Sequence, residues 1–360
     1  MRLRRRTRVT AVALAILLGA TACSSSPPDM TALPPAAIAA ISVGQVLLPD
    51  PTSAENVIVA FDANGDEVGR ITGRNEYGST VARLDDGLFG IAGNGAVVLR
   101  AEGTTLTGPG GRRHIVGSAV DVAAGHAMMW NTFDTTEYVL VSPDREPFGS
   151  EVPGRLVMAG HCDDGWYAGT AQAGGASTRV QLHRLPGPPS TVPVDLPTKA
   201  YNELPLVCAA NGRDLITLIK PIDAVAGPTL VTIDSRSGRT TSRPLTGTDG
   251  NVFLSNRSVT RLDEDLYLID SQRAAYRLPL SGSATTLRKV WQLPLEERDT
   301  RLFISADKVL AVTERAAPTY AEYDLRTGDR LLGPIPLPWL PGVKDGGISV
   351  TGAADVVRPS

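Results

Sequence analysis

The densest group of metal-type side chains in the sequence is the run His161-Cys162-Asp163-Asp164. Imidazole, thiolate and carboxylate groups are the usual protein ligands of transition metals. The run follows an apolar, strand-like segment, and adjacent residues of a strand point to opposite faces. Because consecutive ligands on a strand rarely converge on one ion, we expect no metal site here. No cofactor is predicted.

Cys162 and Cys208 indicate a different chemistry, disulfide formation. Each follows a short apolar strand and precedes a turn glycine, Gly165 and Gly212 respectively. Because they occupy similar places in consecutive repeats of the chain, we expect a bridge between neighbouring strands. It would close a loop of 46 residues and stabilise the fold by about 3–4 kcal/mol in the chain-entropy model. The alternative is two buried free thiols.

The other histidines, His114, His126 and His183, lie in different repeats without an acid at an informative spacing. His126, within residues 125–130, is expected to pack in the core or at its rim. A Gly-x-Ser-x-Gly nucleophile elbow is absent from the sequence, which leaves an esterase unsupported. The loop 62–66 resembles a calcium loop, but it lacks the sixth-position glycine and the final glutamate. A hairpin turn explains it.

Three further features were considered, and two of them have two interpretations each. Arg112, Arg113 and His114 form a basic group in a Gly/Pro-rich loop, which would contact an anionic glycan or serve as a solvated connection. Asn256 begins a glycosylation sequon by pattern alone. Tryptophans stack on sugars or pack between sheets; they stand at Trp130, Trp166, Trp291 and Trp339. No set of acid, base and nucleophile stands out, so the sequence favours a protein that is not an enzyme.

The N-terminus has the pattern of an export signal. Five arginines and no acid occur in the first eight residues, and an uncharged, largely apolar stretch runs from Val9 to Ala22. Such a basic start, short apolar segment and small-residue end describe a secretory signal. The stretch is shorter than the roughly 20 apolar residues of a transmembrane helix.

The residues Ala20-Thr21-Ala22-Cys23 resemble the lipobox of bacterial lipoproteins. The resemblance implies cleavage after Ala22 and acylation of Cys23, including palmitate, followed by a flexible tether. More than one acyl chain is needed for stable anchoring, and a triacylated cysteine supplies them. We therefore expect residues 1–22 to be the signal, 23–54 the lipidated cysteine and tether, and the protein to be anchored on the extracytoplasmic face of the cell membrane. The alternative is ordinary cleavage that leaves Cys23 unmodified.

Charge narrows the range of partners. Removal of residues 1–22 takes away five arginines and no acid, which changes the formal net charge from −3 to −8. An acidic mature protein is a poor match for nucleic acid. With Cys23 lipidated, Cys162 and Cys208 remain as an even pair in an oxidising compartment.

The rest of the chain is built from short β-type runs separated by turns. Strand-and-turn hairpins such as Val57–Phe61 before Asp62, and Thr229–Ile233 before Asp234, recur every 38 to 50 residues. The strand ends used as markers are residues 62, 100, 142, 184, 234, 279 and 324. A repeat of roughly 40–50 residues made only of strands indicates four-stranded propeller blades. Residues 55–358 are therefore predicted to form an all-β, seven-bladed β-propeller, with six or eight blades as alternatives.

The ends of the chain are expected to close the ring. Little strand pattern precedes Val57, whereas Gly347–Thr351 and Ala354–Val357 follow the last hairpin. We expect these C-terminal runs to supply the missing inner strands of the blade that contains Phe61. Closure of this kind removes an exposed sheet edge.

The hairpins Ile233-Asp234-x-x-x-Gly238 and Tyr323-Asp324-x-x-Thr327-Gly328 are similar to those of seven-bladed propellers of the quinoprotein and YVTN-repeat type. The signal and lipobox resemble those of actinobacterial lipoproteins. These likenesses imply a fold and no particular activity. We expect a cell-envelope binding or assembly module that engages an envelope protein or glycan. The alternatives are a quinoprotein-type sugar or alcohol dehydrogenase, a hydrolase, and a glycan-binding lectin.

Overall fold

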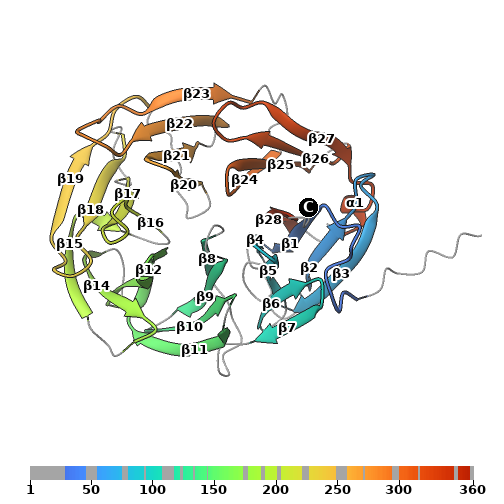
Figure 1. The fold of residues 1–360 in the computed structure, drawn as a ribbon, viewed down its shortest axis with the longest axis horizontal. Helices are drawn as coiled ribbons and strands as arrows, with labels where there is room; N and C mark the ends of the chain where they lie inside the picture. Colours follow the sequence, from blue (N-terminus) through green and yellow to red (C-terminus); the bar gives the residue numbers. More distant parts are fainter. Residues whose placement is uncertain are drawn as a thin grey trace, which may run out of the picture.

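The computed structural model describes residues 29–45, 55–74, 80–92, 95–107, 117–121, 125–132, 134–143, 145–172, 177–187, 191–200, 204–220, 227–248, 258–270, 272–293, 300–314, 317–343 and 348–356. The strands of these residues form five four-stranded sheets and one eight-stranded sheet, arranged as a ring (Figure 1), and the innermost strands enclose a central channel. The all-β propeller is confirmed. None of the helical residues described is part of a helix long and apolar enough to span a bilayer.

In each sheet the strands follow one another from the channel outward. The first holds β28 (Ile348–Asp355), β1 (Ala39–Gln45), β2 (Glu55–Phe61) and β3 (Glu67–Arg74). The second holds β4 (Val81–Leu84), β5 (Gly87–Ala92), β6 (Gly95–Arg100) and β7 (Gly103–Thr107). The third holds β8 (Gly117–Asp121), β9 (His126–Thr132), β10 (Thr135–Ser142) and β11 (Arg145–Pro153).

The eight-stranded sheet consists of two antiparallel runs. One is β12 (Arg155–Cys162), β13 (Gly165–Ala171), β14 (Ser177–Leu185) and β15 (Thr191–Ala200). The other is β16 (Leu204–Cys208), β17 (Leu215–Ile219), β18 (Thr229–Ile233) and β19 (Thr240–Pro244). The innermost strands β12 and β16 join the two runs, because they pair in parallel at Met158 with Leu204 and at Ala159 with Pro205.

Two four-stranded sheets complete the ring. One holds β20 (Val259–Leu262), β21 (Asp265–Ile269), β22 (Ala274–Pro279) and β23 (Arg288–Gln292). The other holds β24 (Thr300–Ser305), β25 (Lys308–Thr313), β26 (Thr319–Asp324) and β27 (Arg330–Pro336), followed by the short helix α1 (Leu340–Val343).

The two ends of the described chain share one sheet, as expected, but in a different arrangement. The C-terminal residues form the single strand β28, which pairs with β1 rather than directly with β2. Strand β1 lies inside residues 23–54, the range expected to be a tether, so the propeller begins before residue 55. Residues Ala39 to Val43 of β1 have no exposed surface. Only two of its seven residues, Ile41 and Val43, are β-branched, so β1 carries little β-type sequence signal.

The polar hairpins form as predicted. The Asp234 carboxylate accepts hydrogen bonds from the backbone N–H groups of Ser237 (2.9 Å) and Arg236 (3.0 Å). These bonds lower the pKa of Asp234 to about 2. Asp62 and Asp324 accept equivalent backbone bonds in their own turns. The turn glycines have positive φ, and a Cβ built on Gly65 would overlap the carbonyl oxygen of Pro336.

The hydrophobic core lies between neighbouring four-strand runs rather than at the centre of the ring. One buried cluster, for example, joins Val43 and Phe61 of the first sheet to Phe303 and Tyr320 of the last. Another cluster joins Met158 of the β12–β15 run to buried residues of the β16–β19 run. The tryptophans belong to these contacts: Trp130 and Trp166 are buried, and the indole N–H groups of Trp291 and Trp339 donate to the carbonyls of Leu325 and Gly65.

Candidate functional site

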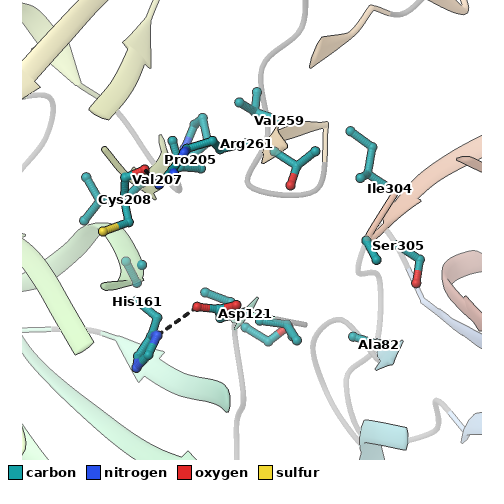
Figure 2. A pocket seen from close by; sticks show the side chains of 18 of the residues that line it. Ala82, Asp121, His161, Pro205, Val207, Cys208, Val259, Arg261, Ile304 and Ser305 are labelled. Atoms are coloured by element: carbon teal, nitrogen blue, oxygen red, sulfur yellow. Dashed lines mark hydrogen bonds and ion pairs between the residues drawn. The ribbon is translucent and has the colours of Figure 1, made fainter. Parts of the chain in front are cut away.

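The channel contains a cavity of about 430 Å³. Its walls come from the innermost strands β4, β8, β12, β16, β20, β24 and β28. Figure 2 shows side chains of these strands around the open space. The residues that line the cavity therefore come from every sheet of the ring and are far apart in the sequence.

Polar side chains are concentrated at the carboxyl ends of the innermost strands. Asp121, Ser305 and Asp355 are the last residues of β8, β24 and β28, and His161 is the last but one of β12. The parallel pairing of β12 with β16 shows that innermost strands of neighbouring runs point the same way. Their carboxyl ends therefore meet at one mouth of the channel.

The first polar group, here called the Asp121 cluster, consists of Asp121, His126, His161 and Trp166. Asp121 Oδ2 lies 2.8 Å from His161 Nδ1, joining β8 to β12 (Figure 2). The imidazoles of His126 and His161 stack with centroids 4.3 Å apart, and Trp166 meets His161 edge-on at 5.2 Å. The His161 side chain is 11% exposed and that of Asp121 is 31% exposed. The carboxylate is thus the more accessible member, and the imidazole holds it in place.

The second polar group, the Asp355 cluster, consists of Asp355, Arg83, Ser305, Lys308 and Glu322. The Asp355 carboxylate accepts from Arg83 Nη1 (3.0 Å), Ser305 Oγ (2.6 Å) and Lys308 Nζ (2.9 Å). Lys308 also donates to Glu322 (2.7 Å). Burial opposes the charge of Lys308, but its bonds to Glu322 and Asp355 outweigh burial and raise its pKa. The cluster neutralises its own charges and ties three sheets together.

The expected disulfide between Cys162 and Cys208 is confirmed, with Cα atoms 5.0 Å apart. Both cysteines line the cavity. The bridge lies beyond the short parallel pairing of β12 with β16 and keeps their carboxyl ends together. Arg261 Nη1 donates to the carbonyls of Cys208 (3.0 Å) and Ala209 (2.9 Å), which fixes the same part of the wall.

The other residues singled out from the sequence have separate surroundings. Cys162 forms the disulfide with Cys208, and the Asp164 carboxylate accepts a hydrogen bond from the Tyr167 hydroxyl (2.9 Å). Within the described ranges, no three His, Cys, Asp or Glu side chains come together in a way that could hold a metal ion. His183 is buried at Thr170, away from the cavity lining. Outside the described residues lie Cys23, Arg112, Arg113, His114 and Asn256.

Asp121, Arg83 and Asp355 were not identified as site residues from the sequence. Asp121 and His161 are 40 residues apart, which is close to one repeat, and both stand at the end of an apolar run. Alignment of the repeats on their innermost strands would have placed them on neighbouring strands. The sequence markers lie on the third strand of each run, so this register was not apparent.

No family model matches the chain, and no curated protein matches it. A solved structure of a functionally unknown protein from Desulfotomaculum acetoxidans is similar over 86% of this chain and 99% of that chain, with 11% identity and a TM-score of 0.50. Apo AztD from Citrobacter koseri shows 10% identity over 90% of this chain and all of that chain, with a TM-score of 0.47. Virginiamycin B lyase from Staphylococcus aureus shows 12% identity over 69% and 85%, with a TM-score of 0.46. At these identities the likeness concerns the fold alone.

Proposed function

We propose that this protein is a lipid-anchored, extracytoplasmic β-propeller that binds a ligand or partner at the mouth of its channel. The observation that carries the proposal is the Asp121–His161 pair. Side chains from two different innermost strands meet at 2.8 Å in the wall of a cavity. A volume of about 430 Å³ lies within the range of small-molecule sites, roughly 300–1,000 Å³.

The number of blades is also part of this proposal. We count seven blades, because the two halves of the eight-stranded sheet behave as separate blades. Buried residues of the β12–β15 run pack against those of the β16–β19 run, including Met158, Leu182 and Ile233. Strands that continued one flat sheet would not enclose such a core.

Export and anchoring rest on Cys23 and on the disulfide. Disulfides persist in oxidising compartments, so the Cys162–Cys208 bridge supports an extracytoplasmic location. The expected modification of Cys23 is tested by labelling cells with an alkyne analogue of palmitate. The wild-type protein should take up label and sediment with membranes, and Cys23→Ala should do neither. Label that persists in Cys23→Ala would end the lipoprotein assignment.

The binding proposal is tested by photocrosslinking in intact cells. Asp163 lines the cavity and is exposed, so a benzophenone amino acid placed there should trap whatever enters the mouth. Glu151 on the outer strand β11 is also exposed and provides the matched control. A discrete adduct from position 163 that is absent from position 151 supports the proposal. Identical patterns from the two positions, or no adduct at 163, would refute it.

A lectin that stacks sugars on tryptophan has less support. The tryptophans that such a lectin would need as a stacking platform pack between sheets, and two of them donate their N–H groups to backbone carbonyls. A dehydrogenase would turn over a sugar when quinone cofactor is added to the purified protein, without any partner. That activity would replace the binding proposal.

A further inference from the structure

We propose that the propeller is held upright on the lipid bilayer, with the outer strand β3 of its first sheet next to the lipid and its channel mouth turned away from it. The inference rests on the proposed lipidation of Cys23. It goes beyond that modification, since an anchor alone does not determine which side of a protein meets the membrane.

The first described residues fasten the chain to the rim of the ring at β3. Asp29 forms a parallel bridge with Arg70, and the backbone N–H of Met30 donates to the Arg70 carbonyl at 2.8 Å. Met30 and Leu33 are buried. The surface of β3 leaves room for this segment only because residue 69 is glycine, since a Cβ there would lie 2.4 Å from Met30 Cγ. The segment therefore belongs to the folded propeller and not to a free tether.

The short stretch between Asp29 and the lipidated residue limits how far this rim can move from the membrane. Asp29 follows Cys23 by six residues, and six residues of fully extended chain span at most about 20 Å. Strand β3 lies one strand spacing, about 5 Å, beyond Asp29. With Cys23 held at the bilayer surface, β3 thus stays within about 25 Å of the lipid. No such limit applies to β19, which lies on the opposite side of the ring (Figure 1).

Charge keeps the channel mouth from lying flat on the lipid. The turns that follow the innermost strands β4, β12, β20 and β24 surround the mouth and contain no lysine or arginine. Some of their carboxylates pair with arginines of other segments. Four exposed ones have no ion pair or side-chain hydrogen bond within the described part of the chain: Asp85, Asp163, Glu264 and Asp307. An anionic phospholipid surface repels these groups over a Debye length of about 8 Å.

The two conditions together give the orientation. The anchor keeps β3 close to the surface, and repulsion keeps the acidic turns away from it. The ring is therefore upright on the bilayer, and its mouth opens beside the membrane. This position favours a partner that is embedded in the membrane or adjacent to it.

The test compares two opposite rims of the ring by energy transfer to lipid. The full-length lipidated protein carries one donor dye, attached through an azide-bearing amino acid at Thr72 of β3 or at Thr241 of β19, both exposed. It is bound to vesicles of phosphatidylglycerol and phosphatidylethanolamine that contain an acceptor-labelled lipid, with a dye pair whose transfer falls off beyond about 25 Å. Transfer should be strong from position 72 and near background from position 241. Equal transfer from the two positions, or stronger transfer from 241, would overturn the inference.

A longer tether provides the decisive variant. Insertion of about 20 Gly and Ser residues between Ser26 and Pro27 increases the maximal reach about fourfold and changes no described residue. Transfer from position 72 should then fall to the level of position 241. The same insertion after Ser360 is the matched control and should leave both values unchanged. A difference between the two positions that survives insertion after Ser26 would also overturn the inference, because something other than the anchor would then hold the rim.

Failure of the anchor and failure of the orientation are distinguishable. Palmitate label that persists in Cys23→Ala would remove the lipoprotein assignment and this inference with it. Label that depends on Cys23, together with equal transfer from positions 72 and 241, would leave the anchor standing and overturn the orientation alone. The cellular adduct at position 163 reports on binding at the mouth independently of both.

Discussion

Arg83 and Asp355 are separated by 272 residues in the sequence, yet Arg83 Nη1 lies 3.0 Å from Asp355 Oδ2. Arg83 belongs to β4 and Asp355 to the C-terminal strand β28, so the contact joins the second sheet to the first. Asp355 is also bound by Ser305 and Lys308 of the last sheet. One carboxylate thus links the three sheets on either side of the point where the ring closes.

Removal of the Asp355 carboxylate should destabilise the contacts that close the ring. The Asp355 side chain is 3% exposed, and its removal leaves two cations without their shared acceptor. Removal of one partner from a buried ion pair costs about 3–5 kcal/mol, so Asp355→Ala should lower the free energy of unfolding in urea by about 3 kcal/mol. Asp195 pairs with Arg179 at the surface and is 79% exposed; Asp195→Ala should cost less than about 1 kcal/mol. Equal losses in the two variants would mean that Asp355 does not hold the closure.

Local features of the fold could be predicted because their causes are local. The hairpins at Asp62, Asp234 and Asp324 depend on an aspartate that caps its own turn and on a glycine with positive φ. Such patterns lie within six residues, so they can be recognised in a single sequence. The disulfide was predictable for a related reason, since Cys162 and Cys208 occupy the same place in successive repeats.

Features that depend on how sheets meet were not predictable. Strand β1 was missed because only two of its seven residues, Ile41 and Val43, are β-branched, and because it pairs with a strand from the other end of the chain. The Asp121–His161 pair depends on the lateral register of two blades, which no local pattern encodes. The parallel pairing of β12 with β16 likewise arises from the close approach of two innermost strands.

The glycine of a hairpin should be far less replaceable than a glycine of an outer strand. Gly65 has φ of +86°, and a Cβ there would overlap the Pro336 carbonyl of the neighbouring sheet. An alanine in the left-handed region costs about 1–2 kcal/mol, and the overlap adds to that, so Gly65→Ala should lower the unfolding free energy by about 2 kcal/mol or more. Gly103 on β7 has nothing within 4 Å of the same position. Gly103→Ala should therefore be neutral in the same urea titration; comparable losses would show that the sheet contact is not limiting.

Removal of the disulfide should destabilise the fold without changing its architecture. The bridge closes a loop with a sequence separation of 46 residues, for which the expected contribution is about 3–4 kcal/mol. The double variant Cys162→Ala/Cys208→Ala should show this loss in urea and keep a β-type circular dichroism spectrum. Added reductant should bring the wild-type protein to the same midpoint and leave the double variant unaffected. A double variant as stable as the oxidised wild type would show that the strand pairing alone secures the wall.

His183 should make stability depend on pH. The Thr170 hydroxyl donates to the carbonyl of Pro153 at 2.8 Å, so it accepts from His183 Nε2 at 2.9 Å. The neutral ring is therefore protonated on Nε2, and Nδ1 is a buried atom with no hydrogen-bond partner among the described residues. A second proton would sit on Nδ1 without an acceptor. Burial accordingly lowers the pKa of His183 below its ordinary value.

The direction of the pH effect follows from this lowered pKa. Below pH 6.5, the ordinary value for histidine, the unfolded chain takes up a proton that the folded protein resists. The free energy of unfolding therefore falls as the pH drops from 7 to 5, by at most about 1.4 kcal/mol per pH unit for one proton. His183→Gln keeps a donor for Thr170 but does not titrate, so its stability should fall less over the same range. His126 and His161 are present in both proteins, so the difference between the two urea series isolates His183. Parallel series would show that the folded protein protonates His183 as readily as the unfolded chain does.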